Sequence, residues 1–403
     1  MAASSTPTAT VLLLVLLACG GATAQVFPRP LFPRAPWNFT FPNGPGDAAG
    51  ASGAGTGATG GGGGGPSVPA MFVFGDSLTD NGNNNDLTSL AKANYLPYGI
   101  DFAGGPTGRF SNGYTMVDAI AELLGLPLLP SNNEASNADS DAGALHGVNY
   151  ASAAAGILDN TGQNFVGRIP FNQQIKNFQT TLNQIKGKIG ASKLASSLGR
   201  SIFYVGMGSN DYLNNYLMPN YNTRNEYNGD QYSTLLVQHY TKQLTSLYNL
   251  GARRFVIAGV GSMACIPNMR ARNPTNMCSP DVDELIAPFN SKVKGMVDTL
   301  NANLPRAKLI YIDNFEMISE VLRSPWNYGF SVVDRGCCGI GRNRGVITCL
   351  PFLRPCPNRN TYIFWDAFHP TERVNVLLGK AAYSGGTDLA YPMNIQQLAA
   401  WQP

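Results

Sequence analysis

The sequence predicts an α/β fold in three layers, a central sheet of about five parallel strands with helices on both faces. Two observations support this prediction. Short runs of β-branched and aromatic residues alternate along the chain with longer stretches whose apolar residues recur at helical spacing. The alternation places a helix between successive strands, which is the pattern of a parallel sheet with helical crossovers.

Five short apolar runs are the predicted strands, and they span residues 70–75, 147–150, 201–206, 253–259 and 308–313. Apolar residues three or four positions apart predict helices between them. These positions are Met116, Ile120, Leu123 and Leu124; Leu235, Leu236, Leu244 and Leu247; and Leu285, Phe289, Val293, Met296 and Leu300. Ligands gather at the carboxyl ends of parallel strands. We therefore expect a functional site in the loops after residues 75, 150 and 206.

The charge balance argues against a polyanionic partner. The 403 residues include 28 Lys and Arg against 25 Asp and Glu, a formal net charge of +3, and only 13% are charged. Such a chain has no basic field dense enough for nucleic acid or an anionic membrane face. No nucleic-acid partner is expected.

The N-terminal residues are predicted to lie outside the folded domain. Residues 11–19 are an apolar run followed by Ala22-Thr23-Ala24, a signal-peptidase pattern, so residues 1–24 are predicted to be a signal peptide. This run is shorter than the roughly 20 residues that span a bilayer, and no transmembrane segment is expected. Residues 25–67, rich in Pro and Gly, are predicted to be a disordered tail and linker. The folded domain is expected over residues 68–403.

Export would bring six cysteines into an oxidising compartment, where disulfides are their expected use. They are Cys265, Cys278, Cys337, Cys338, Cys349 and Cys356. We expect Cys265 to pair with Cys278 and the other four to pair among themselves. A zinc site is the competing interpretation, but no Cys-x-x-Cys and no nearby His pair occur, so no metal is expected. The sequon at Asn38 would permit one glycan.

The first predicted strand leads into a loop that contains Asp76 and Ser77. A serine two residues past a buried strand is suitably placed for a nucleophile whose own amide can face a developing oxyanion. Helix caps and turns use the same residue types, so capping remains an alternative for this loop taken alone.

A base is predicted near the C-terminus, where Asp366 precedes His369 by three residues. Pro370 and Glu372 fit the first and third positions of a helix, so His369 is predicted to be its N-cap. If Asp366 holds one ring nitrogen, the other can take the proton of Ser77. The alternative is that both residues only cap local structure.

Several other chemistries lack their motifs. The sequence contains no Gly-x-Ser-x-Gly, no Walker loop and no His-Glu-x-x-His. His146 lies in a polar loop and His239 in a predicted helix, so His369 is the histidine with a carboxylate at a suitable distance.

Four segments, in this order, resemble the motif blocks of the plant GDSL esterase/lipases, a family of the SGNH hydrolase superfamily. They are Phe-Gly-Asp-Ser-Leu-Thr-Asp-Asn-Gly-Asn-Asn at 74–84, Asn-Tyr-Ala-Ser-Ala-Ala-Ala-Gly at 149–156, Gly-Ser-Asn-Asp at 208–211 and Asp-Ala-Phe-His-Pro-Thr-Glu at 366–372. The resemblance covers about residues 70 to 382. It implies a flavodoxin-like sheet, an ester hydrolase and no cofactor.

The resemblance also implies residue roles. Ser77 would be the nucleophile, His369 the base and Asp366 its orienting partner. The backbone amides of Ser77 and Gly156 and the side-chain amide of Asn210 would donate to the oxyanion, and such donors lower the barrier by stabilising charge that develops in the transition state.

Two neighbouring features have structural interpretations. Asp80 and residues 81–85 are predicted to brace the nucleophile loop through hydrogen bonds from side chain to backbone. For Arg109 two interpretations remain open, a structural ion pair and a substrate contact.

The sequence thus predicts a secreted serine ester hydrolase that acts through an acyl-enzyme in the cell wall or apoplast. Its substrate would be an ester of a lipid, a cutin precursor or an acylated wall polysaccharide. An acyltransferase with the same triad and a non-catalytic wall protein that binds acylated ligands are the alternatives.

Overall fold

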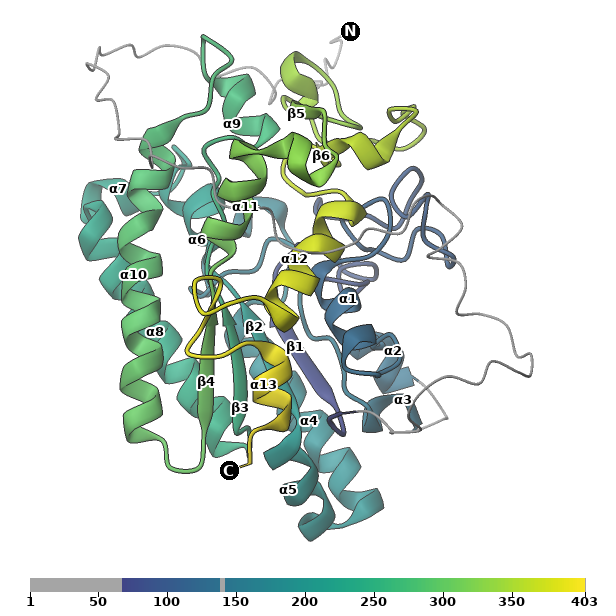
Figure 1. The fold of residues 1–403 in the computed structure, drawn as a ribbon, viewed down its shortest axis with the longest axis vertical. Helices are drawn as coiled ribbons and strands as arrows, with labels where there is room; N and C mark the ends of the chain where they lie inside the picture. Colours follow the sequence, from purple (N-terminus) through teal and green to yellow (C-terminus); the bar gives the residue numbers. More distant parts are fainter. Residues whose placement is uncertain (1–66, 138–141, 403) are drawn as a thin grey trace, which may run out of the picture. The chain divides into compact units, whose positions relative to one another are not determined.

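A five-stranded sheet forms the centre of the fold in the computed structural model, which describes residues 67–137 and 142–402 (Figure 1). Four neighbouring strands are parallel and pair in step, so that their carboxyl ends are level. They are β1 (Met71–Gly75), β2 (Ile202–Gly206), β3 (Arg254–Ala258) and β4 (Lys308–Ile312). The fifth strand, β7 (Ala390–Tyr391), is antiparallel to β4.

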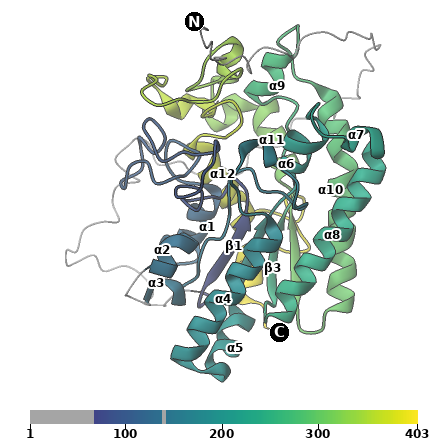
Figure 2. The same ribbon diagram turned by 180° about the vertical axis from the view of Figure 1, so that it is seen from behind.

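Helices cover both faces of this sheet (Figures 1 and 2). On one face, α8 (Gly229–Asn249) packs against α4 (Phe171–Ile189) and α10 (Pro280–Asn303). On the other face, α12 packs against α1, α11 and α13. The ranges of these four are Met116–Leu123 for α1, Asn314–Arg323 for α11, Glu372–Ser384 for α12 and Ile395–Ala400 for α13. The three helices predicted from apolar spacing correspond to α1, α8 and α10, and the predicted three-layer fold is confirmed.

Further α-helices connect these elements. They are α2 (Asn132–Asn137), α3 (Ala142–Leu145), α5 (Ala191–Arg200), α6 (Ser209–Asp211), α7 (Thr223–Glu226) and α9 (Pro267–Arg272). Capping residues explain where two of the layer helices begin. Thr115 and Asp118 form a capping box at the start of α1, and Asn228 and Gln231 form one at the start of α8.

The sheet differs from the prediction of five parallel strands in one respect. Residues 147–150 form no regular strand, although the segment follows the outer edge of β1 in parallel direction. The amides of Met71 and Val73 donate to His146 O and Val148 O, and Tyr150 N donates to Val73 O. The segment makes only isolated bridges, from Asn149 to Val73 on one side and to Ser131 on the other, so it lacks the regular pairing of a strand.

The path of the chain around β1 creates the crevice in which ligands bind in such sheets. After β1, the chain runs along its outer edge over residues 146–152 and then returns to form β2 on the opposite side. The chain segments that follow β1 and β2 therefore diverge at the carboxyl ends of these strands, which is the topological switch point of an open α/β sheet.

A second apolar cluster lies apart from the main core and contains Tyr98, Phe110, Trp365 and four cysteines. It adjoins a parallel pair of short strands, β5 (Val332–Gly336) and β6 (Tyr362–Phe364). The disulfides are Cys265–Cys278, Cys337–Cys356 and Cys338–Cys349, which confirms the predicted grouping.

Within the described residues, no helix has the length and apolar character needed to cross a membrane. The same residues contain no group of three or more His, Cys, Asp or Glu side chains that could hold a metal ion. The predicted signal peptide, the predicted linker up to residue 66 and the Asn38 sequon lie outside the described residues.

Candidate active site

Three side chains from opposite ends of the domain form a continuous chain of hydrogen bonds. The Nε2 atom of His369 lies 2.8 Å from Ser77 Oγ, although 292 residues separate them. Its Nδ1 atom lies 2.9 Å from each carboxylate oxygen of Asp366. Asp366 is fully buried, and His369 is 7% exposed. Such an arrangement lets the imidazole accept a proton from the hydroxyl while the carboxylate stabilises the resulting charge.

Strand β1 and the turn after it position Ser77. The Asp76 carbonyl accepts hydrogen bonds from the amides of Thr79 and Asp80, which closes a tight turn around the serine. Before this turn, the side-chain amide of Gln174 both accepts from Gly75 N and donates to Gly75 O. The end of β1 is therefore held from α4, and the serine is presented at the sheet edge.

Polar side chains behind the serine brace the loop, as predicted. Asp80 Oδ1 accepts from the amides of Gly82 and Asn83 at 2.8 Å, and its Oδ2 accepts from Ala153 N at 2.9 Å. Asn83 Nδ2 donates to two further carbonyls in the 149–151 segment. These bonds join the nucleophile loop to the segment that follows residue 148.

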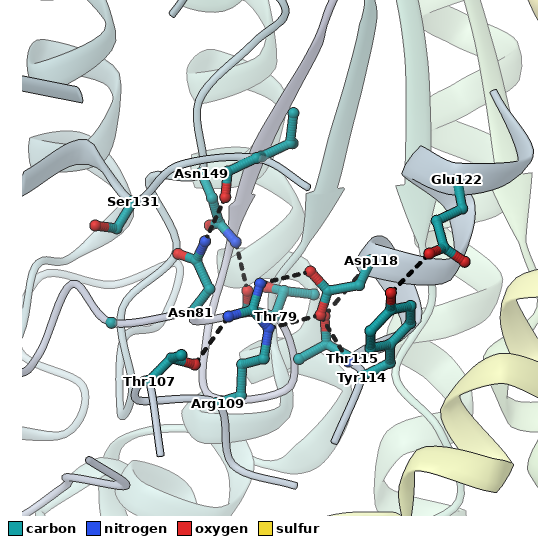
Figure 3. Close-up of polar contacts among 12 residues, drawn as sticks. Thr79, Asn81, Thr107, Arg109, Tyr114, Thr115, Asp118, Glu122, Ser131 and Asn149 are labelled. Carbon is teal, nitrogen blue, oxygen red and sulfur yellow. Dashed lines mark hydrogen bonds and ion pairs between the residues drawn. The ribbon is translucent and has the colours of Figure 1, made fainter. Parts of the chain in front are cut away.

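Arg109 forms a structural ion pair, which resolves the alternative left open by the sequence. Its Nε and Nη2 atoms donate to the two oxygens of Asp118 at 2.8 Å, and its Nη1 donates to Thr107 Oγ1 (Figure 3). Both members of the pair are buried, and Arg109 does not line the cavity described below. Nearby, Asn149 Nδ2 donates to Thr79 O, so the same region supports the nucleophile loop from behind.

The turn that carries Asp366 and His369 differs from the prediction. The N-cap of α12 is Thr371, two residues after His369, and the helix begins at Glu372. Pro370 instead pairs with Phe364 in an antiparallel bridge. His369 is therefore fixed by its turn, in which Asp366 Oδ1 accepts from the amides of Phe368 and His369 at 2.8 Å.

Asp366 and the neighbouring Asp76 have opposite electrostatic environments. Burial alone would raise the pKa of Asp366, but the charge and hydrogen bond of His369 and the donors Tyr98 and Phe368 outweigh it, so the pKa is lowered. Asp76 has no such set of donors, and burial raises its pKa to about 6 against the opposing effects of Leu78 N and His369. Asp366 is thus the carboxylate suited to stay ionised beside the imidazole.

Asn210 comes from the neighbouring strand end. Gly208, at φ 126°, makes the turn between β2 and α6, where a Cβ would lie 2.9 Å from Val260 and Phe289 atoms. Asn210 Nδ2 donates one hydrogen bond to Ala155 O, and its Oδ1 accepts from Asn214. Because a side-chain amide has two N–H groups, one remains available, and Asn210 lines the cavity beside Ser77.

The structure does not bring Gly156 to the cavity, which is lined by its neighbours Ala153 and Ala154. The Ala155 carbonyl points to Asn210 Nδ2, so the Gly156 N–H on the same trans peptide points away from that side chain. Ala154 has a left-handed φ of 65°. Among the described residues, neither the Ala154 amide nor the Ser77 amide has a hydrogen-bond acceptor.

A cavity of about 260 Å³ opens beside Ser77 and His369. Its wall is mainly apolar, and it is formed among others by Leu78, Leu90, Phe165, Leu213, Ile318 and Leu350. Polar groups converge around the serine, while most of the wall area is apolar. This combination suits a ligand with one polar reacting group and an apolar body.

A sequence model of the family described as GDSL-like Lipase/Acylhydrolase matches residues 71–382. The chain belongs to this family. Three GDSL esterase/lipases of Arabidopsis thaliana are similar to it over most of their length. One is 62% identical over 334 residues, covering 83% of this chain and 86% of its own. The others are 49% and 50% identical, covering 82% of this chain and 89% and 92% of their own. Membership of the GDSL family makes the protein a carboxylic ester hydrolase.

Among solved structures, a carbohydrate esterase covers 78% of this chain and 66% of its own with 13% identity and a TM-score of 0.33. That score is too low to carry an argument about this GDSL family member.

Sequence reasoning missed three residues that contact the site. Gln174 holds the end of β1, while Tyr98 and Thr348 donate to Asp366 Oδ2. None of them lies in a motif block or follows a predicted strand. Their contacts arise only when distant loops pack together, so no local pattern in the sequence marks them.

Proposed function

We propose that this GDSL family member is a secreted serine ester hydrolase that works through an acyl-enzyme. One observation carries the proposal, the unbroken hydrogen-bond chain from Ser77 Oγ through His369 to Asp366. The chain ends in an apolar cavity, where an ester carbonyl could approach the serine.

In the proposed reaction, Ser77 Oγ attacks the ester carbonyl carbon while His369 Nε2 takes its proton. The tetrahedral intermediate collapses, His369 returns the proton to the leaving alkoxide, and an alcohol departs. Water then attacks the acyl-serine with His369 again as base, and the carboxylic acid leaves with Ser77 restored. Asp366 stays ionised throughout and stabilises the imidazolium.

The oxyanion would be held by the Ser77 amide and the free N–H of Asn210. Gly156 was the third donor implied by the motif, but its amide points away from Asn210. The Ala154 amide fits this role better, since Ala154 lines the cavity and Gly156 does not, and the Ala154 amide has no acceptor within the described residues. Removing one such donor typically costs about 3–4 kcal/mol of transition-state stabilisation.

The apolar wall of the cavity supports an acyl group with a hydrocarbon chain as the substrate's body. Each CH₂ group buried is worth about 0.8 kcal/mol, so kcat/KM should rise by about two- to fourfold per CH₂ until the cavity is filled. A series of p-nitrophenyl esters of increasing chain length measures this rise. A rate that falls from acetyl onward would contradict the assignment.

Secretion is supported by the three disulfides, which persist in oxidising compartments. The predicted signal peptide over residues 1–24 remains the proposed route. N-terminal sequencing of the exported protein would test cleavage after Ala24.

The decisive experiment compares Ser77→Ala with Ser201→Ala in hydrolysis of a short p-nitrophenyl ester. Ser201 is buried at the amino end of β2, where its hydroxyl donates to Ser197 O, so it controls for loss of a buried hydroxyl. We expect Ser77→Ala to lose hydrolysis and labelling by a fluorophosphonate, and Ser201→Ala to keep both. Hydrolysis retained in Ser77→Ala would overturn the mechanism.

A further inference from the structure

The Asp366 carboxylate is held by a hydroxyl from a distant loop as well as by its own turn. Tyr98 OH donates to Asp366 Oδ2 at 2.5 Å across 268 residues of sequence. Thr348 Oγ1 donates to the same oxygen at 3.1 Å, and the two hydroxyls lie 3.2 Å apart. Within the turn, the backbone amides donate only to Oδ1, while the imidazole of His369 contacts both carboxylate oxygens.

The two carboxylate oxygens are therefore held by donors from different parts of the chain. The amides of Phe368 and His369 hold Oδ1, but they are part of the same short turn and move with it. Tyr98 holds Oδ2 from outside the turn, which prevents the carboxylate from rotating about its Cβ–Cγ bond. A fixed carboxylate plane keeps the imidazole of His369 in the orientation that directs Nε2 at Ser77.

Packing fixes the Tyr98 ring in place. Tyr98 is 1% exposed, and its ring contacts those of Phe110 and Trp365 with centroids 5.8 and 6.2 Å away. The next residue, Gly99, donates to Ser111 O at 2.9 Å, which anchors the loop to the segment before α1. The hydroxyl is therefore presented by a rigid ring, with little rotamer entropy to lose.

The hydroxyl remains a donor over the working pH range. Burial raises the pKa of Tyr98 well above its ordinary value, and the charge and hydrogen bond of Asp366 raise it further. A protonated phenol that faces a carboxylate can only donate to it.

We propose that Tyr98 is a positioning residue of the esterase, which orients Asp366 and, through it, the base His369. This inference rests on the proposed function, because it assigns Tyr98 a role in the same proton transfer. Thr348 supports the same oxygen over a longer distance and is expected to contribute less.

The test is Tyr98→Phe, which keeps the ring and removes only the hydroxyl. We expect kcat for a p-nitrophenyl ester to fall about tenfold, the value of one hydrogen bond to a charged group, with KM changed less than twofold. Thr348→Val should give a smaller fall in kcat. Equal kcat values for Tyr98→Phe and the unaltered protein would overturn the proposal.

The pH dependence separates positioning from a structural role. The Tyr98 hydroxyl partly neutralises the negative charge of Asp366 by donating a hydrogen bond to it. Without the hydroxyl, that charge attracts a protonated His369 more strongly. The acidic limb of kcat/KM should then move to higher pH. The other ionisable groups that face this pair are Asp76 from the loop after β1 and Tyr95 from the Tyr98 segment. Both are unchanged in the variant, and an unshifted limb would contradict the proposal.

A matched control is Tyr240→Phe, which removes a buried hydroxyl from α8 that donates to Val205 O at 3.3 Å. It should lose stability but keep kcat and the pH profile. Fluorophosphonate labelling distinguishes failure of the positioning proposal from failure of the proposed serine mechanism. Slower labelling at Ser77 than in the unaltered protein supports positioning, whereas absence of labelling in the unaltered protein would refute the serine mechanism itself.

Discussion

Arg109 donates two hydrogen bonds of 2.8 Å to the two oxygens of Asp118, and both side chains are buried behind the nucleophile loop. Burial alone would raise the pKa of Asp118, but the charge and hydrogen bonds of Arg109 and Thr115 lower it. The carboxylate is thus ionised, and its buried negative charge is balanced by the guanidinium of Arg109. It also caps α1 by accepting from Thr115 N.

Removing the cation alone should therefore destabilise the domain strongly. We expect Arg109→Met to lower the free energy of unfolding by about 3–5 kcal/mol, because a buried charge is left without its partner. The double variant Arg109→Met/Asp118→Leu should recover part of this loss, although it also loses the cap on α1. Urea denaturation measures both, and a double variant less stable than Arg109→Met would contradict the interpretation.

Neutralising Asp366 should impair catalysis without unfolding the protein. In Asp366→Asn the side chain can donate to Nδ1 and so favour the wrong imidazole tautomer, and kcat should fall by about 10³- to 10⁴-fold. Asp334→Asn, which changes an exposed carboxylate paired with Arg335, is the matched control and should keep full activity. A fall of less than tenfold in Asp366→Asn would argue that another group orients His369.

Asn210 should act on the transition state more than on substrate binding. We expect Asn210→Ala to lower kcat by about 10²- to 10³-fold with little change in KM, as for the loss of one oxyanion donor. Its Nδ2 also holds Ala155 O, so thermal unfolding must be measured alongside. A rise in KM at constant kcat would assign Asn210 to ground-state binding instead.

Glu372 should make stability fall as the pH rises. Burial, opposed by the Tyr114 amide, raises the pKa of Glu372 from 4.5 to about 7. Between these values the folded protein binds a proton that the unfolded chain releases, so the free energy of unfolding decreases with pH in this window. Asp76, Asp80 and Asp211, with pKa values raised to about 6 by burial, add slopes of the same sign at lower pH.

The variant Glu372→Gln isolates this contribution. We expect its stability, relative to the unaltered protein, to increase steadily from pH 4.5 to pH 7 in denaturation curves measured at several pH values. A constant difference across that window would show that Glu372 does not titrate there.

Sequence and structure agree where local pattern determines geometry. Ser77 and Asn210 follow buried strands whose paired residues are in step, Gly75 with Gly206, so their loops had to meet at one edge of the sheet. The pattern failed at residues 147–150, because Asn149 makes only isolated bridges to Val73 and Ser131 in place of a continuous ladder of strand pairs. It failed again at Pro370, which fits a first helical turn yet pairs with Phe364, so that α12 begins later.

Tyr98 marks the limit of what the sequence could predict. Its environment combines Trp365, Phe110 and two disulfides in the second apolar cluster, and these residues come from loops without helical or strand periodicity. Only tertiary packing brings the phenol to Asp366. The same holds for Gln174, whose contact with Gly75 joins a helix to a strand 99 residues earlier.

The order of these groups along the chain limits when the protein can work. During synthesis, the ribosome completes Ser77 and all four parallel strands before it reaches His369, the base in the proposed mechanism. If the proposed mechanism holds, a product truncated before His369 would carry a serine without its base.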